Sequence, residues 1–389
     1  VTSNASTFNY NNASHGGAIY NASSNENTEI LTINKKTTFT QNTAKLGGAL
    51  YNEGNANITS ATFTSNSVDT DIDNPLSGLG GAIYNNTDNK LITITSATFQ
   101  TNNASKAGGA IYNALGNLAI TSSTFSKNTS KDGGAIYNLS SDATTTSSTF
   151  SHNTSTSNGG AVYDQGAITS TKDTYTANTA QNGGAAYIAS TAETNIISGT
   201  FTQNDANISG GAIYNDGKLN VENTTFGHAS KTGYANNAMT GGVLYNTGTA
   251  VITNSIISYN TAEMQAGAIY NTKDITINTS TFTGNKINGS AGMTSIAGVL
   301  LNQSGSTANI VGSTFKSNKA DLGAVIWNLG TVNISGKVDG TKITPTTFAS
   351  NKGTEGGAIY NNLNKYGEDK LAYIETINNA TFTNNKIRT

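Results

Sequence analysis

Three histidines and a run of alternating aspartates are the residues of this 389-residue chain whose types and spacing could do chemistry beyond packing. Glycoside hydrolysis needs two carboxyl groups that converge on one bond, and lyase chemistry on acidic sugars needs a basic group together with a cation. His15, His152 and His228 are scattered along the chain, and Arg388 is its single arginine. Because no set of these residues has catalytic spacing, we expect that the protein is not an enzyme.

The alternating carboxylates Asp69, Asp71 and Asp73 are the best candidate for a metal site. Alternate carboxylates in an extended loop can converge on Ca²⁺. The loop lacks helical flanks, and the twelfth position, which holds a bidentate Glu in a helix–loop–helix calcium site, is Gly80. A solvated acidic loop is therefore the favoured interpretation, with a calcium site as the alternative, and no other cofactor is expected.

The composition excludes several further classes of protein. The chain has 21 Lys and Arg against 23 Asp and Glu, a net charge of −2, and this balance argues against a nucleic-acid partner. The absence of Cys rules out disulfides and thiolate metal sites. The longest apolar run, residues 324–327, is far too short for a membrane helix. Since the chain opens at Val1 without Met, we expect it to be part of a longer protein.

The elements that must carry any site are set by internal repeats. A hexad, Gly-Gly-Ala-Ile-Tyr-Asn at 16–21, recurs thirteen times with starts 24 to 33 residues apart, counting degenerate copies. A second motif, Thr-Phe-x-x-Asn, precedes each hexad, and a short alternating run such as Leu118-Ala119-Ile120 lies between the two motifs. Period-two alternation over so few residues predicts strands. The hexads begin at Gly16, Gly47, Gly80, Gly108, Gly133, Gly159, Gly183, Gly210, Gly241, Ala266, Ala297, Gly323 and Gly356.

Such a unit cannot bury its apolar face alone, whereas stacked units can. The sequence therefore predicts an all-β protein, a right-handed single-stranded parallel β-helix (solenoid) of about 13 coils that forms one domain over residues 1–389. Stacking predicts an internal column of Phe8 and its equivalents and an amide ladder of Asn11 and its equivalents. We expect the hexad Ile to point inward and the Tyr outward, and the reverse assignment remains open. The paired glycines are expected to have positive φ at a tight corner.

Insertions interrupt the repeats at about 67–79, 227–240, 286–296 and 335–347. The three insertions after Phe63, Phe226 and Phe282 are expected to share one place in the coil and hence one face. Insertions on one face of a solenoid often mark its binding side, with tolerated drift of surface loops as the alternative. The second and third insertions predict a joint ledge that carries Tyr234, Asn236, Asn237, Asn288 and Met293.

The hexad tyrosines are a second candidate binding surface, because Tyr offers a large contact area with little loss of entropy. The alternative is that the rings stack only to shield the sheet. The tyrosines proposed for contact are Tyr112, Tyr137, Tyr163, Tyr187 and Tyr214.

Gly-Gly-Ala-[Ile/Leu/Val] alternating with Phe-x-x-Asn resembles the repeats of polymorphic outer-membrane-protein passengers of chlamydial type. The resemblance spans Phe8 to Asn385. It implies an autotransporter-type passenger that is extracellular, exposed at the cell surface, and held at the outer membrane by another part of a longer protein. The resemblance also implies an adhesin whose partner is a protein or glycan on a host or neighbouring cell, or a second copy of the chain. A passive stalk that presents a distal binding domain is the alternative.

Overall fold

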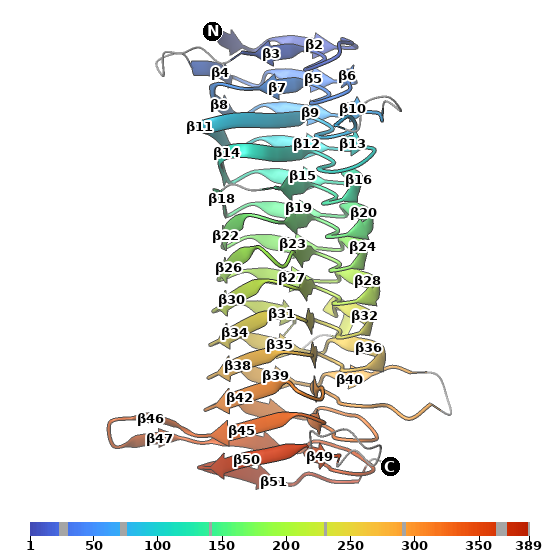
Figure 1. Ribbon diagram of the computed structural model, residues 1–389, viewed down its shortest axis with the longest axis vertical. Helices are drawn as coiled ribbons and strands as arrows, with labels where there is room; N and C mark the ends of the chain where they lie inside the picture. The colour runs from blue at the N-terminus through green and yellow to red at the C-terminus, as the bar shows by residue number, and fades with distance from the viewer. Residues whose placement is uncertain are drawn as a thin grey trace. The chain divides into compact units, whose positions relative to one another are not determined.

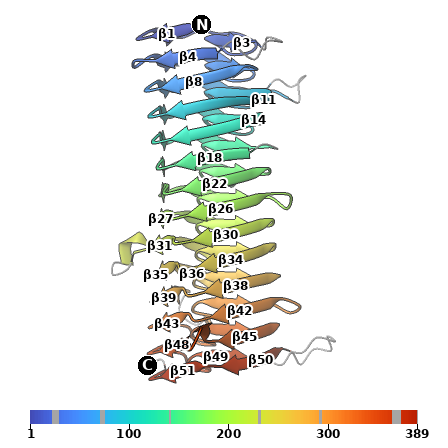
Figure 2. The same cartoon turned by 90° about the vertical axis from the view of Figure 1, so that its left-hand side faces the viewer.

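The computed structural model describes residues 1–22, 30–70, 76–139, 142–228, 232–289, 293–362 and 372–387. The chain divides into two compact units, residues 1–195 and 196–389. In each unit the repeats form successive coils of short strands, and equivalent strands of neighbouring coils pair in parallel (Figures 1 and 2). No α-helix occurs in the described ranges. The predicted all-β class and parallel β-helix are confirmed.

Each coil has three faces. Hexad strands and alternating strands form the first face, the strands of the Thr-Phe motif form the second, and the strands that follow the motif's Asn form the third. Since residues pair with their equivalents, as in Phe39↔Phe63 and Tyr51↔Tyr84, each repeat position becomes a column of like side chains.

In the first unit the first face comprises β1 (Thr2–Asn4), β3 (Ile19–Asn21), β4 (Ile30–Asn34), β7 (Leu50–Asn52), β8 (Asn55–Thr59), β11 (Ile83–Thr95), β14 (Ile111–Thr121), β17 (Ile136–Asn138), β18 (Asp142–Thr146), β21 (Val162–Asp164), β22 (Ala167–Thr171) and β25 (Ala186–Ile188). The second face comprises β2 (Thr7–Asn9), β5 (Thr38–Thr40), β9 (Thr62–Thr64), β12 (Thr98–Gln100), β15 (Thr124–Ser126), β19 (Thr149–Ser151) and β23 (Thr174–Thr176). The third face comprises β6 (Thr43–Ala44), β10 (Ser67–Val68), β13 (Asn103–Ala104), β16 (Thr129–Asp132), β20 (Thr154–Asn158) and β24 (Thr179–Asn182). The division between the units falls within β26 (Glu193–Ile197).

In the second unit the first face comprises β29 (Ile213–Asn215), β30 (Lys218–Glu222), β33 (Leu244–Asn246), β34 (Thr249–Thr253), β37 (Ile269–Asn271), β38 (Asp274–Asn278), β41 (Leu300–Asn302), β42 (Thr307–Val311), β44 (Ile326–Asn328), β45 (Thr331–Ser335), β49 (Ile359–Asn361) and β50 (Tyr373–Asn378). The second face comprises β27 (Thr200–Thr202), β31 (Thr225–Gly227), β35 (Ile256–Ser258), β39 (Thr281–Thr283), β43 (Thr314–Lys316), β48 (Thr346–Ala349) and β51 (Ala380–Thr383). The third face comprises β28 (Asp205–Ser209), β32 (Asn237–Thr240), β36 (Thr261–Gln265) and β40 (Lys286–Ile287).

Two elements of the second unit lie outside this pattern. β46 (Lys337–Asp339) and β47 (Lys342–Thr344) form an antiparallel hairpin that projects beside β45 (Figure 1). A short 3₁₀ turn, η1 (Thr232–Tyr234), stands out from the coils near β31 and β35 (Figure 2).

The phenylalanine column fills the interior, as predicted. Phe39, Phe63 and Phe99 are fully buried, and successive rings stack with centroids 4.6 and 4.8 Å apart. Such offset stacks add to the burial energy of the rings. In the second unit Ile257 occupies this position and is also fully buried.

The predicted amide ladder is present at the turn that follows the second face. The Nδ2 of Asn128 donates to Oδ1 of Asn153 at 2.9 Å and to the Phe99 carbonyl at 3.0 Å. The Asn128 backbone N–H donates to the same Asn153 oxygen at 3.0 Å. The coil that contains Asn128 is therefore held to the next one through side chain and backbone together, which satisfies the buried amide.

A second amide ladder, not predicted from the sequence, runs through the last residue of the hexad. Asn52 donates to Asn85 at 2.8 Å and Asn85 to Asn113 at 2.7 Å, and all three side chains are buried. The Asn that ends most copies of the hexad was the available signal.

The paired glycines have two different functions, so the prediction of positive φ holds for only one of them. Gly47 has φ of +59°. Gly48 faces the next coil instead, and a Cβ there would lie 2.2 Å from the Gly81 carbonyl oxygen. The first glycine therefore permits the turn, whereas the second permits the close approach of neighbouring coils.

One coil of the first unit has a polar interior. Tyr175 replaces Phe in the aromatic column, and Asp173 occupies a position held elsewhere by Ser. Both side chains are buried. Asp173 accepts hydrogen bonds from the Thr145 hydroxyl at 2.5 Å and the Ser170 hydroxyl at 2.7 Å. Loss of hydration on burial raises the pKa of Asp173 above its ordinary value, although these hydrogen bonds oppose the shift.

Candidate functional site

The tyrosine column consists of the hexad Tyr residues, and its orientation is now settled. Leu50 and Ile83 have no exposed surface, whereas Tyr51 and Tyr84 retain 7% and 9%. The aliphatic residue therefore faces the core, as predicted, and the tyrosine lies on the outer side. The small exposure of these rings arises because they stack on one another and pack against Leu46 and Leu79.

The tyrosines proposed for contact present little of their ring faces. Tyr112 is 8% exposed, and Tyr137 stacks between Tyr112 and Tyr163 with centroids 5.0 and 4.5 Å away. Tyr163, Tyr187 and Tyr214 are half-buried. The column thus shields the first face, which is the alternative considered from the sequence.

Loss of hydration raises the pKa of Tyr84, Tyr112 and Tyr137 above the ordinary value, so these hydroxyls stay protonated over the physiological range. Loss of hydration raises the pKa of Tyr245 to about 12, and the neighbouring Tyr270 and Tyr214 rings contribute. The Tyr137 hydroxyl donates to the Gln165 side chain at 2.8 Å. These hydroxyls therefore support stacking as well as any contact.

The predicted insertions do not share one place in the coil. The loops after Phe63 and Phe282 follow third-face strands β10 and β40. The insertion after Phe226 comes earlier, between the aromatic strand β31 and the ladder residue Asn236. The fourth insertion, 335–347, contains the β46–β47 hairpin and lies between the first and second faces. The expectation of a single shared face for the three insertions is therefore wrong for the one after Phe226, which enters one corner earlier than the other two.

Asn236 is not a surface residue, contrary to the prediction. It is fully buried and belongs to the amide ladder, with its Nδ2 donating to Asn260 at 2.9 Å and to the Phe201 carbonyl at 2.9 Å. The motif at Phe226 therefore keeps its ladder Asn, ten residues downstream instead of three. A search that allowed variable spacing would have found it.

The other four ledge residues lie at or near the surface. Tyr234 is 38% exposed and its ring lies 5.0 Å from that of His228. Asn237 donates to Asp205 at 3.0 Å, Asn288 is exposed, and Met293 is 55% exposed. Met293 borders a hollow of about 620 Å³ together with Asp321 and Glu355.

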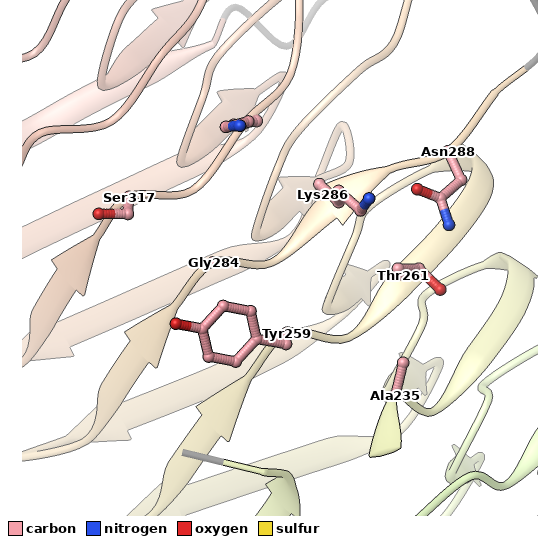
Figure 3. Close-up of a pocket in the computed structure, with 8 residues that line it drawn as sticks. Ala235, Tyr259, Thr261, Gly284, Lys286, Asn288 and Ser317 are labelled. Atoms are coloured by element: carbon pink, nitrogen blue, oxygen red, sulfur yellow. The ribbon is translucent and has the colours of Figure 1, made fainter. Parts of the chain in front are cut away.

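A cleft of about 400 Å³ lies where the two ledge loops approach each other in the second unit (Figure 3). The first loop contributes Ala235 and the second contributes Asn288. The remaining lining residues are Tyr259, Thr261, Gly284, Lys286, Ser317 and Lys319. The predicted ledge thus exists as a cleft, although only Asn288 of the residues named for it lines the walls.

Backbone turns position the cleft's aromatic group. Tyr259 and Gly284 occupy the same turn position in successive coils, with φ of +58° and +67°. A Cβ on Gly284 would lie 2.6 Å from Tyr259 Cε1, so glycine leaves room for the ring. The ring consequently lies along the turn beside Gly284 (Figure 3).

The polar wall of the cleft comes from the third face. Thr261 pairs in register with Lys286, and Lys286 with Lys319. The eight lining residues include two lysines and no acidic residue. The cleft therefore combines one aromatic ring, amide and hydroxyl groups, and positive charge, which suits a polar anionic ligand.

The candidate calcium site lies largely outside the described residues. Asp69 is exposed, whereas Asp71 and Asp73 are not described. Over the described ranges, no group of three His, Cys, Asp or Glu side chains is arranged to hold a metal ion. The candidate thus stays a prediction.

The three histidines lie in different places. His15 bonds to the Ser14 hydroxyl at 2.9 Å and packs edge-on against Tyr51 at 5.0 Å. His152 occupies a turn with φ of +55°, and His228 packs on Tyr234.

Parallel coils, stacked aromatic rings and amide ladders define the class of this chain as a β-helical repeat protein. Within that class, the repeat of the Chlamydia polymorphic membrane proteins matches residues 36–53, 60–86, 122–139, 147–165 and 345–362. These five stretches are accordingly similar to the repeat of that family, as the motifs of the chain indicated. No curated protein matches the chain significantly. In the part of the chain that the structure describes, no helix is long and apolar enough to cross a membrane.

Proposed function

We propose that this chain is the surface-exposed passenger of an adhesin and that it attaches cells through the sides of its coils. The repeats of polymorphic-membrane-protein type support a surface-associated passenger. The partner in this proposal is a protein or glycan on a host or neighbouring cell.

One observation carries the proposal: the second unit has a cleft lined by Tyr259, Thr261, Lys286 and Lys319. In the first unit the column equivalent to Thr261 contains Thr129, Thr154 and Thr179. A stalk needs only the buried columns, whereas the cleft adds ring, amide and cationic groups that packing does not require. Lys286 and Lys319 are exposed and the Tyr259 ring is half-buried, so these groups suit contact with a partner.

The test uses beads coated with residues 1–389 and added to host epithelial cells and to bacteria. Adhesion predicts bound beads, and the Tyr259→Ala/Lys286→Gln variant should bind several-fold fewer cells. Lys127→Gln/Lys172→Gln, which removes two exposed lysines from turns of the first unit, is the matched control. Inert wild-type beads would contradict adhesion and leave the stalk as the explanation.

Mixing beads of two colours adds an arm for self-association. Mixed clumps without cells would identify a second copy of the chain as a partner. Binding to cells without clumps would assign the contact to a different surface molecule.

A further inference from the structure

A column of four lysines follows the third face of the second unit. Lys286, Lys319, Lys352 and Lys386 pair in register, each with the next. We propose that this lysine column, together with the cleft at its start, binds a linear acidic polysaccharide that carries a carboxylate or sulfate on successive sugars. The inference rests on the proposed function and names the chemical class of its partner.

The backbone fixes the position of these lysines. Each follows a ladder residue directly, as Lys286 follows Asn285 and Lys319 follows Asn318. The ladder asparagines are buried and bonded from coil to coil, with Asn285 donating to Asn318 at 3.1 Å. Neighbouring strands lie about 4.8 Å apart, so the four lysines extend over about 14 Å. The column is therefore a row of charges on a rigid support.

The lysine side chains point to solvent. All four are exposed, whereas the residues that follow Lys286 and Lys319, Ile287 and Ala320, are buried. Within the described ranges, none of the four ammonium groups has an ion-pair or hydrogen-bond partner. The charge is thus available to a ligand.

Within the described ranges, the nearby carboxylates form no ion pair with the lysines of the column. Asp321 accepts hydrogen bonds from the backbone N–H and the hydroxyl of Ser295, both at 2.9 Å. Glu355 borders the hollow beside Met293, and Glu263 is exposed on β36. Like charges placed directly opposite on neighbouring strands are destabilising, so this arrangement has a cost that a bound polyanion would relieve.

The shape of the site selects among anions. A single small anion would contact one or two lysines, whereas a linear polymer with regularly spaced charges can contact all four at once. The half-buried Tyr259 ring and the exposed Asn288 side chain at the end of the column suit a sugar ring, which has one apolar face and many hydroxyls. The structure therefore favours an acidic polysaccharide.

Nucleic acid fits less well. Single-stranded nucleic acid binds where several aromatic rings in succession stack bases, and the cleft contains one ring, Tyr259. The four lysines also offer no bidentate guanidinium for phosphate. Nucleic acid is therefore an outcome of the test that counts against the proposal.

The experiment measures binding of residues 1–389 to immobilised polymers by biolayer interferometry at several salt concentrations. The probes are heparin fragments, hyaluronan oligosaccharides, neutral dextran, and single- and double-stranded DNA. Binding to heparin alone would assign the anion as sulfate, and binding to hyaluronan as well would include carboxylate. Both outcomes require affinity that falls steeply with salt and no binding to dextran.

Variants locate the site. Lys319→Gln should weaken binding about two- to fivefold, as expected for one exposed ion pair. Neutralising all four lysines should abolish it, whereas the Lys127→Gln/Lys172→Gln control should bind as wild type. Thr129, Thr154 and Thr179 occupy the equivalent column of the first unit, so changing all three to Lys in the four-fold neutral variant should restore binding.

Three results would overturn the inference: equal affinity for DNA and polysaccharide, an unchanged affinity after loss of all four lysines, or equal loss in the control. The proposed function has a separate readout. Beads that bind cells equally well with and without the lysines would leave adhesion standing and remove the polysaccharide as its partner. If the chain binds polysaccharide but its beads do not bind cells, the polysaccharide inference would stand and adhesion would be contradicted.

Discussion

The outer column of the third face differs between the two units, although both are built on the same buried pattern. In the first unit this column consists of small polar residues, and the hydroxyls of Thr154 and Thr179 bond to each other at 3.1 Å. In the second unit the column begins with Asp205, Asn237 and Thr261 and continues as Lys286 and three further lysines. The residue before each of these positions is in both units a ladder Asn, which is buried except at the terminal Asn11 and Asn385.

This difference distinguishes the residues that the fold requires from the residues that can vary without changing it. Asn153 and Asn318 each bond through side chain and backbone to the next coil, so the ladder sets the register. The next residue points outward, and its identity leaves the pairing unchanged. Stability therefore depends on the interior columns, whereas the outer columns are free to carry charge and contact.

The largest effect is expected when an interior residue is compared with its outward neighbour. Asn153→Ala removes hydrogen bonds to Asn178 and to the Phe125 carbonyl, and it leaves the buried Asn128 amide without its acceptor. We expect about 3 kcal/mol or more of destabilisation, since each buried group left unpaired costs about 1–3 kcal/mol. Thr154→Lys, one residue later, should cost less than about 0.5 kcal/mol.

Hydrogen exchange of peptides from the first unit, followed through urea, measures both variants. The single tryptophan, Trp327, gives fluorescence that reports on the second unit in the same samples. Comparable losses of stability in the two variants would show that outward residues also determine the register of the coils.

A second prediction uses the polar coil, which distinguishes the first unit from the second. Burial raises the pKa of Asp173 and of Asp164, so the folded state binds these protons more tightly than the unfolded state. The free energy of unfolding of the first unit should therefore fall as pH rises from the ordinary Asp range through the raised pKa values. Among the described residues of the second unit no carboxylate is buried.

Asp173→Ser, which restores the residue found at Ser148 and Ser123, should reduce this pH dependence without harming the fold. Exchange of first-unit peptides from pH 4 to 8 is the measurement, with Trp327 fluorescence as the internal reference. A wild-type curve that rises with pH, or one unchanged by the substitution, would contradict the assignment.

The repeats made much of the fold predictable, because equivalent residues had to stack once the coil was recognised. Phe39 and Asn42 could therefore be placed inside before the structure was known. Asn236 could not, since an insertion moved it away from Phe226. The lysine column was not predicted for another reason. Net charge is summed over the whole chain, whereas the register of the coils places four lysines in one line. The signal was the Asn-Lys pair at 285–286 and in three later repeats.

A third, smaller effect concerns the tyrosine column. Tyr137→Ala removes one ring from a stack and the hydrogen bond to Gln165, which should destabilise the first unit by about 1–2 kcal/mol. Because the ring is half-buried in the stack, attachment of coated beads should change by less than about twofold. Loss of attachment in a folded Tyr137→Ala chain would instead make this column the contact surface.

The smallest expected effect is that of the lysine column on the stability of the second unit. Four like charges spaced about 4.8 Å apart lie well within the Debye length of about 10 Å at 0.1 M salt, and they repel one another while no ligand is bound. Lys319→Gln should therefore stabilise the second unit by a few tenths of a kcal/mol in low salt, and the gain should vanish near 1 M salt. Trp327 fluorescence during urea unfolding measures the difference, with Lys127→Gln of the first unit as the control. A stabilisation that salt does not remove would mean that Lys319 is unfavourable for packing reasons. Charge repulsion within the lysine column would then not lower the stability of the second unit.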